Sequence, residues 1–152
     1  MSEVPLTNDI NYNTKKDFEP LPKGVYPVEI EDVKLEKFTS TKTGQSWMCW
    51  KMRMNILSGP YAGRKIFDNK GITAKAAAYI GNMIEAVIGD INGMTLQEEK
   101  GLILRNGIPM KPSDIVGARV NVEIYVKGKY NNVKSYSKID DVQEAGNQTV
   151  PF

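Results

Sequence analysis

The sequence of 152 residues contains no histidine, a single cysteine and no long hydrophobic run. Without histidine, the commonest general base and imidazole metal ligand are absent, so Ser-His and Cys-His catalytic arrangements are excluded. A lone Cys49 can form neither an internal disulfide nor a structural zinc site, which fits a reducing cytoplasm. No apolar run approaches the roughly 20 residues that span a bilayer. We therefore expect a cytoplasmic protein that is neither an enzyme nor a membrane protein and that carries no metal or cofactor.

Charge is distributed unevenly along the chain. The formal net charge is only +2, but residues 24–139 hold 17 basic and 11 acidic residues, a net charge of +6. Residues 140–152 hold three acids and no Lys or Arg. A length near 150 residues favours one domain, and polar residues 1–22 show no sustained periodicity. We therefore expect a flexible N-terminal arm at residues 1–22, a domain at residues 23–139 and an acidic C-terminal tail at residues 140–152.

Alternating apolar residues predict strands in the first third of this domain. The alternation that begins near Tyr26 changes parity at Asp32, which indicates a bulge or a sharp bend. From residue 48 to 56 the even positions are all apolar, so one face of the strand expected at residues 46–56 belongs to the core. The opposite face carries Trp47, Cys49, Lys51, Arg53 and Asn55.

The remaining pattern gives the order of the elements. A short third strand is expected at residues 64–68, and then a helix that Thr73 caps and that ends near Ile88. Residues 89–117 give little signal beyond a short helix around residues 95–104, and a hairpin follows from Ala118. This order predicts an all-β protein with one or two helices. It matches the OB-fold, a five-stranded Greek-key barrel with a helix between strands 3 and 4.

Cations recur together with aromatic residues on the polar faces and turns of these strands. Single-stranded DNA needs this mixture, because cations neutralise phosphates while flat rings stack on bases. We expect Trp47, Tyr125, Tyr130 and Tyr136 to stack on bases. The full candidate set is Lys34, Phe38, Trp47, Lys51, Arg53, Arg64, Lys65, Tyr125, Lys127, Lys129, Tyr130, Lys134, Tyr136 and Lys138. Two alternatives stay open: a merely solvated barrel face, and a Trp47 that packs under the N-terminal arm or in a homodimer interface.

Four turn and strand motifs of the domain occur in a known family. They are residues 22–26 (Pro-Lys-Gly-Val-Tyr), 42–44 (Lys-Thr-Gly), 59–68 (Gly-Pro-Tyr-Ala-Gly-Arg-Lys-Ile-Phe-Asp) and 114–120 (Asp-Ile-Val-Gly-Ala-Arg-Val). Through them, the chain from residue 20 to 139 resembles a family of small bacteriophage single-stranded DNA-binding proteins with an OB-like fold, formerly labelled as of unknown function. The resemblance implies binding to single-stranded DNA during phage replication, recombination or repair.

The end of the acidic tail carries a second resemblance. Val150, Pro151 and Phe152 are similar to the Pro-Phe tip of bacterial single-stranded DNA-binding proteins, which recruits replication and repair enzymes. The resemblance implies that replication or recombination proteins bind this tail. The sequence departs from that pattern at residues 146–149, where aspartates are usual. A different function stays open beside DNA binding, namely an OB-like adaptor or inhibitor that binds a host enzyme.

Overall fold

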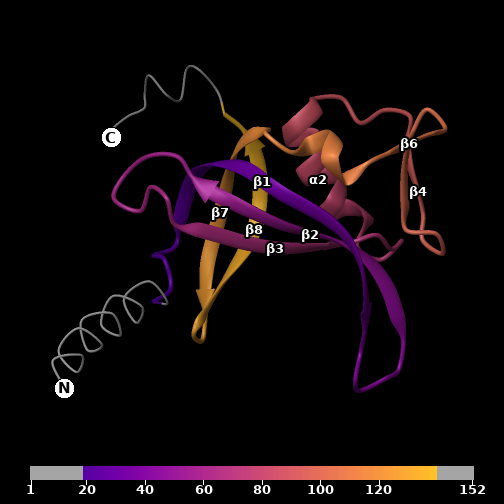
Figure 1. Cartoon of the computed structure of the whole chain (residues 1–152), viewed down its shortest axis with the longest axis horizontal. Coiled ribbons are helices and arrows are strands. Elements are labelled where there is room, and N and C mark those ends of the chain that lie inside the picture. Colours follow the sequence, from indigo (N-terminus) through magenta and orange to yellow (C-terminus); the bar gives the residue numbers. More distant parts are fainter. Residues whose placement is uncertain (1–18, 140–152) are drawn as a thin grey trace, which may run out of the picture.

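The computed structural model describes residues 19–139, which form a mostly β structure with one α-helix (Figure 1). This confirms the predicted all-β class and the position of the helix. In chain order the elements are β1 (Gly24–Thr39), β2 (Ser46–Ile56), β3 (Lys65–Gly71), α2 (Ala77–Ile88), β4 (Met94–Gln97), β5 (Leu102–Arg105), β6 (Ile108–Met110), the 3₁₀-helix η1 (Pro112–Ile115), β7 (Arg119–Lys127) and β8 (Tyr130–Lys138).

Five strands form the larger sheet in the order β3-β2-β1-β7-β8, and every neighbouring pair is antiparallel. The long strand β1 serves both halves of this sheet, because residues 24–29 pair with β7 and residues 28–39 pair with β2. The register with β2 shifts between Ile30 and Asp32, which confirms the predicted bulge. A bulge bends its strand and increases the local twist, so it lets β1 turn from one half of the sheet into the other.

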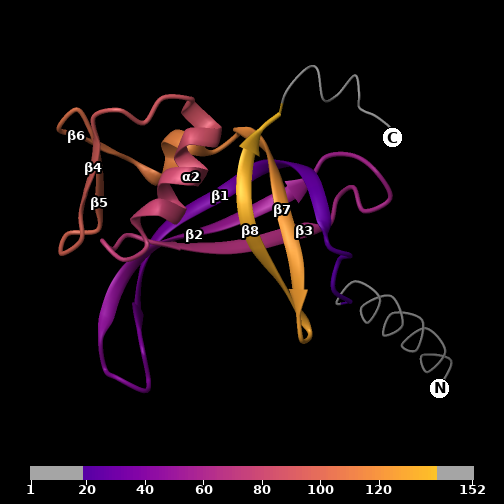
Figure 2. The same cartoon turned by 180° about the vertical axis from the view of Figure 1, so that it is seen from behind.

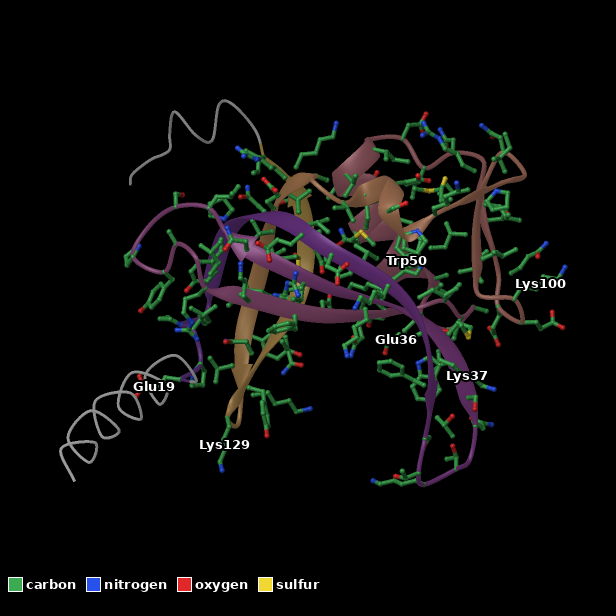
Figure 3. The ribbon with its side chains drawn as sticks, viewed as in Figure 1. Glu19, Glu36, Lys37, Trp50, Lys100 and Lys129 are labelled. Carbon is green, nitrogen blue, oxygen red and sulfur yellow. The ribbon has the colours of Figure 1, made fainter. Side chains whose placement is uncertain are left out.

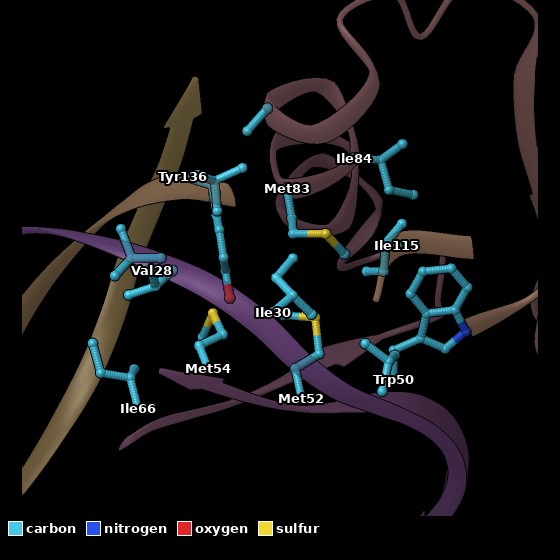
Figure 4. Packing of buried hydrophobic residues seen from close by; sticks show 14 of the residues in the cluster. Val28, Ile30, Trp50, Met52, Met54, Ile66, Met83, Ile84, Ile115 and Tyr136 are labelled. Atoms are coloured by element: carbon cyan, nitrogen blue, oxygen red, sulfur yellow. The ribbon is translucent and has the colours of Figure 1, made fainter. Parts of the chain in front are cut away.

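The core lies between the curled sheet and α2 (Figure 4). The even positions of β2 from Met48 onward point into it, as the alternation predicted, and Trp50, Met52 and Met54 are almost completely buried. The helix covers this core with Ile80 and Ile84, and it packs mainly against β8. It ends at Ile88 as predicted, but it begins at Ala77 and its N-cap is Ala76, so the prediction that Thr73 caps it is wrong. Thr73 Oγ1 instead accepts a hydrogen bond from the Ala76 N–H at 3.0 Å, within the turn that precedes the helix.

Strands β3 and β8 are the two edges of the sheet, and no strand ladder joins them within the described residues. Side chains bridge them instead. The Tyr136 hydroxyl donates to Asp68 Oδ2 at 2.6 Å, and Lys70 Nζ lies 3.1 Å from the same oxygen. Asn82 of α2 bonds both backbone groups of Tyr136, at 2.8 and 3.1 Å. This β3–β8 seam (Asp68, Lys70, Asn82 and Tyr136) ties together three elements that are distant in the chain.

The region with little sequence signal contains a small antiparallel sheet, in the order β4-β5-β6. The helix predicted around residues 95–104 is therefore wrong. The region turns at residues whose backbone φ is positive, which a helix cannot accommodate. Gly101 (φ +66°) lies just before β5, and Asn106 and Gly107 (φ +51° and +82°) join β5 to β6. An Asn-Gly pair is the typical sequence of a two-residue hairpin turn, so this signal was present in the sequence.

Gly101 also sets how closely the small sheet approaches β2. A Cβ added to Gly101 would lie 2.7 Å from Met48 Cβ, and its φ of +66° strains any other residue. We expect Gly101→Ala to lower the free energy of unfolding by about 3 kcal/mol, because backbone strain and overpacking add. Gly107→Ala is the matched control: its φ is +82° and no atom lies within 4 Å, so about 1 kcal/mol is expected from strain alone. Equal losses in urea unfolding would contradict this packing.

The folded domain begins earlier in the chain than residue 23, the start that we expected from the sequence. Leu21 is 1% exposed, and the Asn131 side chain bonds both its backbone N–H and its carbonyl oxygen at 2.8 Å. These contacts hold the segment before β1 against the β7–β8 hairpin. At least residues 21 and 22 of the predicted arm therefore belong to the domain.

Candidate nucleic-acid interface

Two hairpin arms flank β2 and β3 on one side of the molecule. The β1–β2 arm turns at residues 40–45 and the β7–β8 arm at residues 128–129, and both arms point downward in the two opposite views (Figures 1 and 2). Side chains on the outward side of β2 and β3 line two shallow hollows between the arms. We call this surface the outer face; its cations and rings are Lys34, Phe38, Trp47, Lys51, Arg53, Lys65 and Phe67, and its acids are Glu31, Asp32 and Glu36.

Two lysines stand directly opposite each other at the centre of the outer face. The register of β1 and β2 pairs Lys34 with Lys51, and like charges in that position destabilise a sheet. Asp32 lies 3.8 Å from Lys34 and Glu36 lies 4.0 Å from Lys51, so each lysine has an acidic neighbour. Exposed ion pairs of such length contribute little energy. Both ammonium groups therefore stay available to an anion such as a phosphate.

Arg53 and Lys65 are more strongly paired, which the sequence did not predict. Glu31, at the bulge of β1, accepts from Lys65 Nζ at 2.8 Å and from Arg53 Nε at 3.1 Å. The hydrogen bond from Lys65 has the largest effect on the pKa of Glu31 and lowers it. Burial opposes this effect, and the weaker hydrogen bond from Arg53 lowers the pKa further. This part of the outer face is thus partly neutralised.

Phe67 is the aromatic residue that the candidate set missed. Its side chain is 63% exposed, it stands opposite Arg53 in the register, and it lines both hollows together with Lys51. The outward position of Phe67 could have been predicted. Ile66 points inward on the short third strand, so the next residue must point outward. An exposed phenyl ring beside cations can stack on an unpaired base.

Trp47 is half-buried at the far end of the outer face. Its ring lies 6.3 Å from the Phe38 ring at an interplanar angle of 52°, so the two rings form one aromatic pair across β1 and β2. Cys49 follows on the same face but is buried, and this burial raises the pKa of its thiol against a smaller effect of a hydrogen bond from Trp47. The thiol is therefore protected, as expected for an inert cysteine.

The candidate residues of the β7–β8 arm lie away from the centre of the outer face, although Asn131, Asn132 and Val133 of β8 line the second hollow. β7 borders the first half of β1, so Tyr125 lies near Val25 and away from Lys34. Lys127, Lys129 and Tyr130 are exposed at the arm's tip, where Figure 3 labels Lys129, and Lys134 pairs with Glu123 at 3.8 Å. These residues can reach a strand bound between the arms only from its flank.

Tyr136 does not face solvent, which corrects the prediction that it stacks on bases. It is 3% exposed and belongs to the β3–β8 seam. The register of β7 and β8 pairs Glu123 with Ser135 but Ile124 with Val133, so Lys134 is an extra residue. This bulge reverses the parity of the strand and turns Tyr136 into the core. The sequence pattern gave no sign of the insertion.

Two further cations of the candidate set serve local structure. Arg64 Nη2 donates to the Glu19 carbonyl oxygen at 2.7 Å, which holds the segment before β1. Lys138 Nζ lies at the carboxyl end of α2, within 3.0 Å of where a Cβ on Gly89 would be. A cation in that place is favourable to the helix dipole. Neither residue joins the centre of the outer face. The predicted partner-binding tip Val150, Pro151 and Phe152 lies outside the described residues.

Within residues 19–139, no group of three His, Cys, Asp or Glu side chains comes close enough together to hold a metal ion. None of the helices described is both long and apolar enough to cross a membrane. The described residues thus form a mostly β structure, and its outer face combines two opposed lysines with one exposed ring, Phe67, and two half-buried rings, Phe38 and Trp47.

Comparison with known proteins assigns the chain to a family. It belongs to the family described as "Protein of unknown function (DUF669)", whose model matches residues 8–148. No curated protein matches the chain significantly. No solved structure matches it significantly either.

Proposed function

We propose that this protein binds single-stranded DNA on its outer face, without strong sequence preference. The observation that carries the proposal is the position of Phe67, an exposed ring that shares two hollows with Lys51. Lys34 stands opposite Lys51, and an anion between them relieves a repulsion that the fold otherwise retains. Phosphates contact the lysines while bases stack on Phe67 and, further along β2, on Trp47.

A single strand suits this face better than a duplex. Stacking on Phe67 requires a base whose flat face is accessible, and bases of a duplex are already stacked on one another. The helix α2 buries Ile80, Met83 and Ile84 against the sheet, so it is held within the fold and not presented as a recognition helix. The exposed tip of the β7–β8 arm, with Lys129 and Tyr130, adds contacts at the flank of the bound strand.

We further propose that the larger sheet is an OB-type barrel. In the sheet order β3-β2-β1-β7-β8, the fourth of these five strands along the chain lies beside the first, as in a five-stranded Greek key, and α2 follows the third strand along the chain. OB barrels are partly open, as this sheet is. The β3–β8 seam then corresponds to the joint of the barrel. In such folds the face of the second and third strands and the flanking loops bind nucleic acid, and the outer face occupies that position.

The biological setting follows from the resemblance of residues 20–139 to phage single-stranded DNA-binding proteins. The protein then protects single strands during phage replication or recombination in the cytoplasm of the host, without catalysis or a cofactor. Its acidic tail, through Val150, Pro151 and Phe152, recruits replication or recombination proteins.

One observation favours a second candidate function, an adaptor or inhibitor that binds a host enzyme. Glu31 neutralises Arg53 and Lys65, and mixed charges of this kind are typical of protein-binding surfaces. Such an adaptor has no affinity for single strands, so the two candidates differ in a simple binding experiment.

The salt dependence of binding tests the DNA proposal at named residues. Each lysine that contacts a phosphate of a single strand adds about 0.7 to the slope of log K against log salt. We expect the Lys34→Ala/Lys51→Ala variant to lower this slope by about 1.4 in titrations of labelled oligo-dT. The control is Lys100→Ala/Arg105→Ala, which removes two exposed cations of the small-sheet region and should leave the slope unchanged. An unchanged slope in the first variant excludes the lysine pair as the phosphate site.

A further inference from the structure

A separate hollow lies at the Trp47 end of the outer face. We propose that it holds a single unpaired base and that the carboxylate of Glu98 selects the bases with an amino group at C4 of a pyrimidine or C6 of a purine, namely cytosine and adenine, over thymine and uracil. This inference rests on the proposed binding of single-stranded DNA and gives it a base preference at one position. The hollow is lined by Gln45, Ser46, Trp47, Gly71, Thr73, Lys75, Ala76 and Glu98.

The space beside the indole exists because residue 71 is a glycine. A Cβ on Gly71 would lie 3.7 Å from Trp47 Cδ1 and 3.6 Å from Ala76 Cβ, so any side chain would extend into the hollow. The φ of Gly71 does not lie in the left-handed region, and no backbone strain explains the glycine. A small residue here keeps one side of the Trp47 ring accessible.

Trp47 is also held in place, which makes it a fixed platform. The Phe38 ring packs against it with 6.3 Å between centroids, and the strand pairing of Phe38 with Trp47 holds the two residues opposite each other. Trp47 remains only half-buried despite these contacts. A base that stacks on such a ring gains energy without the cost of ordering a mobile side chain.

Glu98 gives the hollow its chemical preference. Its Oε1 accepts the Ala74 N–H at 2.8 Å, which fixes the carboxylate beside the turn that precedes α2. No protein donor among the described residues reaches its other oxygen, Oε2. A carboxylate accepts hydrogen bonds and donates none, so it attracts the N4 amino group of cytosine or the N6 amino group of adenine and repels O4 of thymine.

The same contact argues against a phosphate in the depth of this hollow. Glu98 already bonds a backbone N–H of the turn that an anion would use, and its negative charge repels a second anion. The cation of the hollow, Lys75, is exposed, so it can contact the backbone of the same nucleotide at the rim. The arrangement is therefore a base above an aromatic ring, with its amino edge toward a carboxylate.

The test compares two labelled 20-mers of thymidine that differ at one central nucleotide, dC in one and dU in the other. These two bases have the same size, and at position 4 one carries an amino group and the other an oxygen. We expect the full-length protein to bind the dC oligonucleotide roughly tenfold more tightly, the effect of one hydrogen bond to a charged group. Glu98→Gln can still accept from Ala74 and should abolish this difference, while Glu99→Gln, an exposed neighbour outside the hollow, should retain it.

Each outcome decides a different point. Equal binding of the two oligonucleotides by the wild type overturns the base preference but leaves the proposed function standing. A preference that persists in Glu98→Gln overturns the assignment to Glu98. No binding to either oligonucleotide refutes the proposed function, and the inference fails with it.

Discussion

Replacing Phe67 by alanine is expected to weaken binding to a labelled 20-mer of thymidine roughly tenfold at constant salt. Stacking of one base on an aromatic side chain is worth about 1–3 kcal/mol, and Phe67 is the exposed ring nearest to Lys51 and Arg53 on the outer face. Because the side chain is 63% exposed, its removal should leave the free energy of unfolding nearly unchanged. Fluorescence anisotropy measures the affinity, and urea unfolding measures the stability.

Tyr79 provides a matched control for this substitution. It is also an aromatic residue with 63% exposure, but it lies on α2 and lines neither hollow of the outer face. Tyr79→Ala should therefore bind oligo-dT like the wild type. Equal affinities of Phe67→Ala and the wild type would remove Phe67 from the interface, and equal losses in both variants would point to a general effect of losing a surface ring.

Replacing Lys70 by methionine is expected to cost about 3–5 kcal/mol in the free energy of unfolding. Lys70 is 7% exposed, and its ammonium pairs with Asp68 while lying 5.2 Å from the centre of the Tyr136 ring. Removal of one partner leaves a buried charge that is only partly compensated, which is far more costly than removal of both. Lys37→Met, at an exposed lysine of the β1–β2 arm (Figure 3), should cost almost nothing.

The double variant Asp68→Leu/Lys70→Met decides whether the cost comes from the uncompensated charge. It should be more stable than Lys70→Met alone, because no unpaired carboxylate remains at the β3–β8 seam. Urea unfolding of the wild type, Asp68→Leu, Lys70→Met and the double variant gives the coupling energy between the two residues. If the double variant is less stable than Lys70→Met by the whole loss that Asp68→Leu causes alone, the two residues are not coupled. In that case packing, and not charge, stabilises the seam.

Alkaline pH should also weaken the seam. Burial, and then the charge of Asp68 and the hydrogen bond to it, raise the pKa of Tyr136 well above its usual range. The neutral phenol is favoured in the folded state, so its contribution is complete below pH 10, the ordinary pKa, and is lost as the pH rises above it. Tyr136→Phe cannot ionise. It should therefore lose less stability than the wild type between pH 9 and pH 11.

The alternation of β2 was sufficient to predict the core of this fold. Its even positions from Met48 to Ile56 are all apolar, and tertiary contacts agree with that local pattern at Trp50, Met52 and Met54. The bulge of β1 at Asp32 was predictable for the same reason, since the apolar residues themselves change parity there. The strand β2 and the bulge of β1 could be predicted because both depend on side chains that are close in the sequence.

The bulge of β8 could not be predicted, and with it the role of Tyr136. Only Lys134 and Ser135, both polar, lie between Val133 and Tyr136, so no run of alternating apolar residues marks the change of parity. The partner that makes burial of Tyr136 favourable is Asp68, 68 positions earlier in the chain. A network whose members lie on β3, α2 and β8 leaves no periodic signal in any one of them.

The candidate interface was predictable only in part. The sequence placed Lys34, Lys51 and Trp47 on outward faces, but their mutual arrangement depends on strand register. Only the register reveals that Lys34 stands opposite Lys51 and that Glu31 reaches both Arg53 and Lys65. Charge counts along a chain therefore overestimate how many cations of a sheet face are available to phosphate.

Binding of single-stranded DNA to the outer face is tested most simply with one labelled 20-mer of mixed sequence, compared as a single strand and as a duplex. We expect saturable binding of the single strand that weakens steeply as salt rises, and much weaker binding of the duplex. Equal affinity for both forms would contradict stacking on Phe67 and Trp47. No binding of the single strand at low salt would contradict the DNA proposal as a whole and leave the adaptor as the function to pursue.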